Sequence, residues 1–311
     1  MFEYKNYPTI QSFSQIERLL DKQGLPFLKE HLLSTAVPCY RVELNKLILR
    51  EAKIGESKLG GLPQLPPGFP WPNKDGRQLM FIAQLNLSEI EHDHVPDFPL
   101  PKHGLLTFWF DIAGYPGGYR STDLNGFQVY YFDDITHLRI RDLPELDISK
   151  LENAPCSPWT PFGEKYVRAI PSYRLNLDAI EDVDLHEAGI SDEEFEQRRY
   201  EWYDTLDPIL FPEPQHQLLG KPYVIQEPME HYCHRLTNDL PLHGKLDRAD
   251  QERLDALTTH ENDWRLIFQI DSHKDPTDWM WGDCGMLYYW IKDQDLRARD
   301  FSKIWGMLQC C

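Results

Sequence analysis

Two segments of this chain carry nearly the same strand-like hexapeptide, and they constrain its fold more than any other feature. Around them lie two further pairs of matching blocks in the same order along the chain. The three pairs are FIAQLN (81–86) with LIFQID (266–271), Gly61-x-Pro63 with Gly220-x-Pro222, and GLLTFW (104–109) with GMLYYW (285–290). Three matches in register predict an internal duplication.

The fold class predicted from this pattern is α+β: a mainly antiparallel β-sheet built from two duplicated β-rich repeats, with short flanking helices. We expect a single domain over residues 1–311, made of an N-terminal helical segment (1–36), a first β-rich repeat (37–150) and a second β-rich repeat (160–311). The strand patterns behind this prediction lie at 40–50, 79–85, 104–110, 127–132, 164–175, 264–271, 285–292 and at the end of the chain.

A glutamine interrupts the apolar run at the same phase of both hexapeptides, as Gln84 and Gln269. Each follows a proline-rich stretch, such as GGLPQLPPGFPWPNKDG at 60–76, whose backbone groups have no regular ladder to satisfy them. A glutamine supplies donors and an acceptor, so we expect both to be buried and bonded to backbone groups. The alternative is that both face a shared ligand cleft.

The composition supports a globular chain made and kept in the cytoplasm. With 311 residues, 41 % of them hydrophobic, the chain can bury a large core. It has no apolar run long enough for a membrane span and no secretory signal at its start. Its six cysteines contain no CxxC pair, which favours reduced and mostly buried thiols.

The net charge of −18 disfavours nucleic acid and anionic membranes as partners. Half of this excess lies in residues 178–204, which hold eleven acidic residues against two arginines. Ser191 begins a capping-box motif there, and it predicts a helix near 191–206 with a buried stripe of Phe195, Trp202 and Leu206. The acidic face of that helix is either a solvated surface or a binding patch for a basic partner.

No motif identifies catalytic residues, and we expect no cofactor and no metal. HYCHRL (231–236) lacks the paired spacing of zinc ligands, which favours a structural or surface role. Cys284 stands beside Asp283, which would raise rather than lower its pKa. A turn allowed by Gly282 and Gly285 is the simpler interpretation of WGDCG, with a nucleophilic thiol as the alternative.

The candidate ligand-binding residues lie in the loops that adjoin the matched strands. Loop tryptophans are candidates for recognition because aromatic anchors dominate interface hot spots, although packing over a sheet edge is the alternative. We expect a groove between the two repeats, since pockets form where packed units join. The residues proposed to line it are Lys58, Trp71, Gln84, Gln269, Trp281 and Asp283.

The chain resembles the YwqG-like family, a bacterial domain of unknown function. The resemblance is carried by SKLGGLPQLP, FIAQLNL, LPKHGLLTFWF, HQLLGKPYVIQ, LIFQIDS, MWGDCG and RDFSKIWGMLQC, which extend from about residue 57 to the end. It implies a sheet-rich cytoplasmic protein without an assigned activity.

Two functions remain open at this point. The first is a non-enzymatic protein that binds an unknown protein partner or small molecule through aromatic loops between the repeats. The alternative is a carboxylate-dependent hydrolase or transferase with a site near Asp271 and Asp283.

Overall fold

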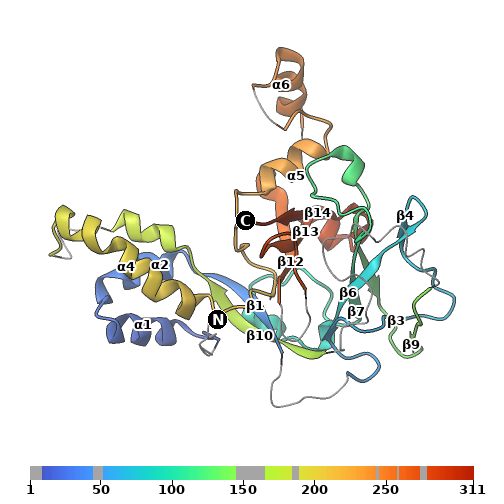
Figure 1. Cartoon of the computed structure of the whole chain (residues 1–311), viewed down its shortest axis with the longest axis horizontal. Coiled ribbons are helices and arrows are strands. Elements are labelled where there is room, and N and C mark those ends of the chain that lie inside the picture. The colour runs from blue at the N-terminus through green and yellow to red at the C-terminus, as the bar shows by residue number, and fades with distance from the viewer. Residues whose placement is uncertain are drawn as a thin grey trace.

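The computed structural model describes residues 9–44, 52–144, 165–183, 189–242, 245–257, 259–273 and 279–311. The expected boundary between the repeats, at 150–160, and Cys156 lie outside these residues. A sheet forms the body, and helices gather on one side of it and at its top (Figure 1).

The strands of this body agree closely with the strand patterns in the sequence. Ten of them form one sheet, and four two-residue strands form two small separate ribbons, β3 with β9 and β4 with β5. Their bounds are β1 (Val37–Leu44), β2 (Lys58–Leu59), β3 (Gln64–Leu65), β4 (Asn73–Lys74), β5 (Arg77–Gln78), β6 (Met80–Asn86), β7 (Leu105–Phe110), β8 (Phe127–Phe132), β9 (Arg139–Ile140), β10 (Lys165–Arg174), β11 (Gln217–Leu218), β12 (Trp264–Asp271), β13 (Met286–Lys292) and β14 (Trp305–Gln309).

The α-helices and short 3₁₀ turns connect or flank these strands. They are α1 (Phe13–Lys22), η1 (Pro26–Leu28), α2 (Lys29–Ser34), η2 (Leu87–Glu89), η3 (His92–His94), η4 (Ser121–Asp123), η6 (Leu177–Asp182), α4 (Asp192–Leu210), α5 (Glu230–Leu236), α6 (Arg248–Asp255), η7 (Glu261–Asp263), α8 (Asp293–Arg297) and η8 (Phe301–Lys303). No helix among the described residues is long and apolar enough to cross a bilayer.

The predicted α+β class with two duplicated repeats is wrong. Strands from both halves of the chain join in one ten-stranded antiparallel sheet, in the order β14-β13-β12-β11-β1-β10-β2-β6-β7-β8. This sheet curls until it is nearly closed, like a barrel, so the fold is dominated by β-structure. The physical reason is the pairing of β1 with β10, which fuses the halves instead of leaving them as separate units.

The matched hexapeptides occupy similar local positions within this one sheet. Gln84 of β6 pairs with Lys58 of β2, and Gln269 of β12 pairs with Gln217 of β11. A register shift interrupts β6 between Phe81 and Ala83, and another interrupts β12 between Leu266 and Phe268. The similar sequences therefore reflect similar local strand geometry.

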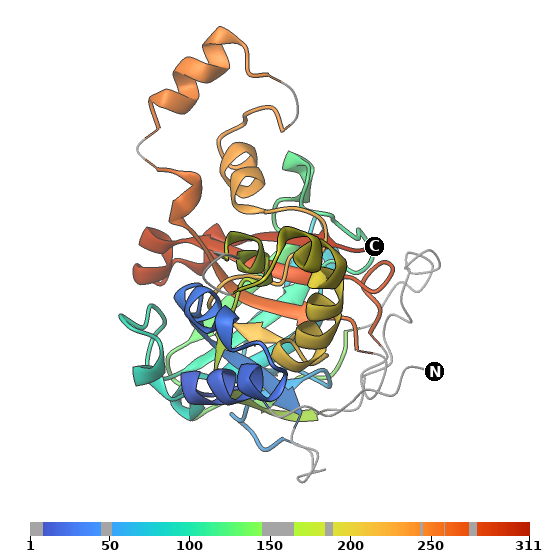
Figure 2. The ribbon, with the colours of Figure 1, turned by 90° about the vertical axis from the view of Figure 1, so that its left-hand side faces the viewer.

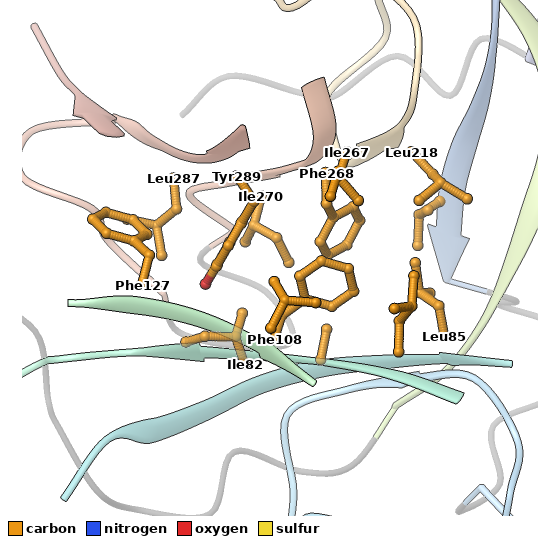
Figure 3. Packing of buried hydrophobic residues seen from close by; sticks show 14 of the residues in the cluster. Ile82, Leu85, Phe108, Phe127, Leu218, Ile267, Phe268, Ile270, Leu287 and Tyr289 are labelled. Atoms are coloured by element: carbon orange, nitrogen blue, oxygen red, sulfur yellow. The ribbon is translucent and has the colours of Figure 1, made fainter. Parts of the chain in front are cut away.

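The curled sheet has two arms, one formed by β2, β6, β7 and β8 and the other by β11, β12, β13 and β14. The main core lies between these two arms (Figure 3). Side chains of β6, β7 and β8 face side chains of β12 and β13 across it. The Phe108 ring lies 4.5 Å from the Phe268 ring and 5.2 Å from the Tyr289 ring, measured between centroids. Aromatic packing across the interior therefore holds the two arms together.

A helical lobe, formed by α1, η1, α2, η6 and α4, stands beside the sheet with its own hydrophobic cluster (Figure 2). The predicted N-cap is confirmed, because the Ser191 hydroxyl accepts a hydrogen bond from the Glu194 amide at 3.2 Å. The predicted stripe is also confirmed, since Phe195, Trp202 and Leu206 are buried in this cluster.

The two edge strands of the sheet, β14 and β8, approach each other closely at a glycine. Gly306 of β14 lies against the Phe127 side chain of β8, and a Cβ placed on it would lie 1.8 Å from Phe127 Cγ. Leu308 also donates its amide to the Gly117 carbonyl at 3.0 Å. Close packing at Gly306 therefore brings the two ends of the sheet together.

Replacing Gly306 should loosen this closure. We expect Gly306→Ala to destabilise the protein by about 1–3 kcal/mol, because the added methyl group overlaps Phe127. Urea unfolding measures the change. Gly117→Ala is the matched control, since its Cβ would meet only the Tyr119 ring at 3.3 Å. Equal stability of the two variants would contradict the close-packing account.

The predicted burial of the two glutamines is confirmed, since both are fully buried. Gln269 accepts the Tyr223 amide at 2.9 Å and donates to the Gln215 carbonyl at 2.7 Å. Gln84 donates to the Glu56 carbonyl at 2.7 Å. Each amide therefore holds an irregular segment against its strand.

Removing either amide should leave backbone groups buried without partners. We expect Gln84→Leu and Gln269→Leu each to lower the free energy of unfolding by about 1–3 kcal/mol. Gln251→Leu, on the exposed surface of α6, is the control. Denaturant melts in which the two core variants match this control would contradict the structural role.

Candidate functional site

A cluster of buried polar and charged side chains lies on the face of the sheet opposite the main core. Side chains alternate along a strand, so Tyr40 and Val42 of β1 enter the core while Arg41 points to the other face. Arg41 is opposite Gln217 of β11, and Gln217 is opposite Gln269 of β12. We call Arg41, Arg174, Gln215, Gln217 and Asp271 the arginine cluster.

Arg41 is 7 % exposed and is held by neutral oxygen atoms. It donates to Gln215 Oε1 at 2.8 Å and to the Pro214 carbonyl at 2.6 Å. It also donates to the carbonyl of Pro212. Burial lowers the pKa of its guanidinium group. The guanidinium thereby fixes the proline-interrupted segment 212–215 onto β1.

Arg174 of β10 is 5 % exposed and lies beside this segment. Its guanidinium donates to Gln217 Oε1 at 2.7 Å and to Gln215 Oε1 at 2.9 Å. It also lies 4.7 Å from the centroid of the Phe211 ring. Burial lowers the pKa of Arg174 to about 10. Arg174 therefore ties β10 to the end of α4.

Asp271 supplies the carboxylate of the cluster, at the end of β12. Its Oδ2 accepts a hydrogen bond from the backbone N–H of Gln215 at 2.7 Å. Burial raises the pKa of Asp271 to about 7, while that amide and Arg41 act in the opposite direction. This carboxyl group therefore changes its charge near neutral pH, as general acids and bases do.

Two histidines adjoin Asp271. The Asp271 amide donates to His216 Nδ1 at 3.1 Å, so His216 carries its proton on Nε2. That nitrogen lies 3.3 Å from His273 Nδ1 and donates to it. Burial holds the pKa of His216 well below its ordinary value, which keeps its ring neutral.

The geometry suits a structural role better than catalysis. Gln215 is 2 % exposed, and both His216 and Gln269 are fully buried. Gln215 and Gln269 donate to the Phe211 and Gln215 carbonyls, and His216 accepts the backbone N–H of Asp271. A substrate could reach these groups only if residues 211–215, which precede β11, moved away from the sheet.

The structure buries three of the predicted site residues, Lys58, Gln84 and Gln269. Lys58 is fully buried and donates to the Leu62 carbonyl at 2.5 Å. Gln84 also donates to Gln64 Oε1 at 2.9 Å. Lys58 and Gln84 lie together on paired strands, whereas Gln269 lies in the other arm of the sheet.

Trp71 and Trp281 are not brought together. Trp71 is half-buried and packs edge-on against Trp109 at 5.3 Å, whereas Trp281 is fully buried and packs against Phe110 at 5.9 Å. Trp109 and Phe110 are neighbours on β7 and point to opposite faces of the strand. The two indoles therefore do not line one groove. Asp283 is exposed at the surface.

The arginine cluster escaped the sequence reasoning. Arginine in a strand usually points to solvent, so CYRVEL (39–44) and PSYR (171–174) gave no warning of burial. One signal was present: QHQ at 215–217 is a polar run between the proline-interrupted segment and an apolar strand. Such a run predicts side chains that satisfy an irregular backbone.

The histidines and cysteines that the structure describes do not gather into a metal centre. Among the described residues, no group of three or more His, Cys, Asp or Glu side chains is placed to hold a metal ion. Cys233 of the HYCHRL motif is buried on α5, with its Sγ 3.7 Å from Met307 Sδ. Burial raises the pKa of Cys233 well above its ordinary value. This thiol is a packing group.

Comparison with known families gives one match. A family model described as a domain of unknown function (DUF1963) matches residues 57–310. The match begins just before β2 and includes α4, the arginine cluster apart from Arg41, and β14. A search of curated proteins found no match.

The raised pKa of Asp271 predicts a pH-dependent stability. The folded pKa of about 7 exceeds the ordinary 3.8, so the stability that Asp271 contributes is complete below pH 4 and is lost as pH rises through 7. We expect the Asp271→Asn variant to gain stability relative to the parent protein over that interval, by on the order of 4 kcal/mol.

Chemical unfolding at pH 4 to 8 measures this difference. Asp255→Asn, on the exposed surface of α6, controls for the loss of one charge. A difference between Asp271→Asn and the parent that does not change with pH would contradict the assignment.

Proposed function

This chain belongs to the DUF1963 family, and from that premise we propose that it is a non-enzymatic binding protein. We propose further that it is a YwqG-like member, because the sequence blocks of that family recur from residue 57 onward. Its partner is a basic protein that docks on the acidic helical lobe. The cytoplasmic location expected from its thiols stays a prediction.

The exposed ring of Tyr200 carries this proposal. Tyr200 lies on α4 and is 66 % exposed, the largest value among the exposed large hydrophobic side chains of the described residues. Arg199 covers part of it, with its guanidinium 4.9 Å from the ring centroid. Tyrosine is enriched at interface hot spots, where a rigid aromatic group gives contact area at low entropic cost.

The surroundings of Tyr200 select a basic partner. The 19 residues of α4 contain seven acidic residues and two arginines. Both arginines already bond to acids of the chain, Arg198 to Glu194 at 3.0 Å and Arg199 to Glu181 at 3.3 Å. The face around Tyr200 thus keeps a negative excess, which attracts basic surfaces and repels acidic ones.

The hydrophobic cluster of the lobe also holds α4 in a fixed position. Trp202 and Leu206 of α4 pack with Ile16, Leu20 and Leu32 from the N-terminal helices. A helix fixed on its buried side loses little conformational freedom when its outer side binds. Tyr200 takes the role that the sequence had suggested for Trp281, whose indole is buried in the core.

A carboxylate-dependent hydrolase or transferase is the second candidate. The raised pKa of Asp271 favours it, since a carboxyl group that titrates near pH 7 can exchange protons in a reaction. Its weakness is access, because Asp271 is 7 % exposed and its neighbours are bonded to one another. The exposed Asp283 would have to act from outside this cluster.

Affinity capture with matched variants tests the binding proposal. The protein and a Tyr200→Ala/Asp204→Lys variant are immobilised and exposed to an extract of the source cells. Positions 200 and 204 lie one turn apart on α4, so both changes alter the same face. We expect basic proteins to be retained by the parent and lost from the variant.

The control is an Ile140→Ala/Asp255→Lys variant, which removes exposed apolar area and reverses one charge outside the lobe. For a captured protein, we expect the dissociation constant to rise at least tenfold with the lobe variant and to rise with salt. Equal retention by the lobe variant and the control would overturn the proposal.

A further inference from the structure

Two exposed cysteines lie where β13 begins and β14 ends. The backbone amide of Cys311 donates to the Asp283 carbonyl at 3.0 Å, which places Cys311 next to Cys284. Both thiols are free and exposed. The charge of Cys311 also acts on the Cys284 thiol, so the two side chains lie near each other. A disulfide joins cysteines whose Cα atoms are about 4.4–6.8 Å apart, and the bridge proposed below requires that separation.

The other described thiols differ from this pair. Cys39 and Cys233 are buried, and burial raises the pKa of Cys39 to about 11. Cys310 is half-buried, and a Cβ placed on Gly282 would lie 2.7 Å from its Sγ, so its sulfur faces that loop rather than solvent. Exposure therefore separates Cys284 and Cys311 from the remaining described thiols.

The backbone at Cys284 supports a role beyond packing. Cys284 has a φ of 51°, a left-handed conformation that few residues other than glycine adopt. Gly285 beside it is crowded, since a Cβ there would lie 2.2 Å from the Gln309 carbonyl oxygen. The two ladder ends are thus held close together and present the Cys284 side chain at the surface.

We propose that Cys284 and Cys311 form a reversible disulfide when the protein meets a peroxide. This inference is independent of the proposed binding function. The bridge would link the loop that carries Trp281 to the end of β14. It would enclose residues 284–311 in one covalent loop. The oxidised protein would then unfold less readily, because its unfolded chain is restricted.

The step balances with hydrogen peroxide as the oxidant. One thiolate attacks a peroxide oxygen, which releases hydroxide and leaves a sulfenic acid. The second thiol displaces the sulfenic hydroxyl group as water and forms the S–S bond. In sum, two thiols lose two electrons and two protons, and one peroxide becomes two waters.

The surroundings of Cys284 indicate which of the two cysteines reacts first with peroxide. Burial and the neighbouring carboxylate of Asp283 raise the pKa of Cys284, which makes it a slow first nucleophile. We therefore place the sulfenic acid on Cys311 and let Cys284 resolve it. A Cys284→Ser variant should accordingly accumulate a dimedone-reactive sulfenic acid at Cys311.

Peptide mapping of the full-length protein tests the bridge. The protein is treated with equimolar hydrogen peroxide, its remaining thiols are blocked with N-ethylmaleimide, and it is digested with trypsin. We expect peptide 275–292 linked to peptide 304–311 with one N-ethylmaleimide group on Cys310. Its mass should be two hydrogens below the sum of peptide 275–292 and the singly labelled peptide 304–311, and reductant should separate the two. The melting temperature should rise by roughly 3–5 °C on oxidation.

Serine variants identify the partner of Cys284. The link should persist in Cys310→Ser and disappear in Cys284→Ser and Cys311→Ser, whose melting temperatures before oxidation show that they fold. A link that persists in Cys311→Ser would overturn the assignment. So would a protein that forms only intermolecular dimers, or one oxidised at Cys39 or Cys233 before Cys284.

Discussion

The pairing of β1 with β10 is the interaction on which the rest of the structure depends. Eight residues of β1, Val37–Leu44, run antiparallel to residues 174–167 of β10. At Tyr40 and Arg41, β1 also pairs with β11, and β10 pairs with β2 at its other end. Each half of the sheet thus borrows its inner strand from the other half of the chain. Only this exchange makes one sheet that can curl and bring Phe108 against Phe268.

A second constraint follows from the first, since the central strands need cover on both faces. One face meets the aromatic core, while residues 211–215, which precede β11, cover the other with carbonyl groups that side chains bond. Prolines lack an amide hydrogen but keep the carbonyl acceptor, so such a segment carries more acceptors than donors. Arg41 corrects that imbalance by donating to the Pro212 and Pro214 carbonyls, and Arg174 donates to the side chains of Gln215 and Gln217 beside them. In the other arm, Lys58 donates to the Leu62 carbonyl of the proline-rich loop, and Gln84 donates to the Glu56 carbonyl just before β2. Gln84 therefore interrupts its apolar strand because the irregular backbone beside it needs a donor.

This logic shows which parts of the structure sequence reasoning could reach. The strands around Gln84 and Gln269 and the cap at Ser191 were predictable, because each depends on residues close in sequence. The partner of β1 was not, because periodicity marks a strand without saying which distant strand completes it. The fold class was misjudged for that reason. Trp281 was misplaced similarly: its loop position suggested exposure, but the Asp271 carbonyl accepts its indole N–H inside the core. The burial of Arg41 depends on the covering segment, which lies about 170 residues further along the chain.

Most of the hydrogen bonds of the arginine cluster are made within the fold, and this has a consequence for function. Where buried donors and acceptors satisfy one another, a ligand must compete with bonds that hold the fold, so recognition is easier on a surface that the fold does not need. The outer face of α4 is such a surface. The hydrophobic cluster beneath α4 has two sources. Trp202 and Leu206 lie within the region that matches the family, whereas Ile16, Leu20 and Leu32 lie before it. Substitutions of these three residues can therefore adjust the tilt and exposure of α4 from its buried side. A lobe arranged in this way can vary its outer face while the sheet stays the same, as the proposed binding function requires.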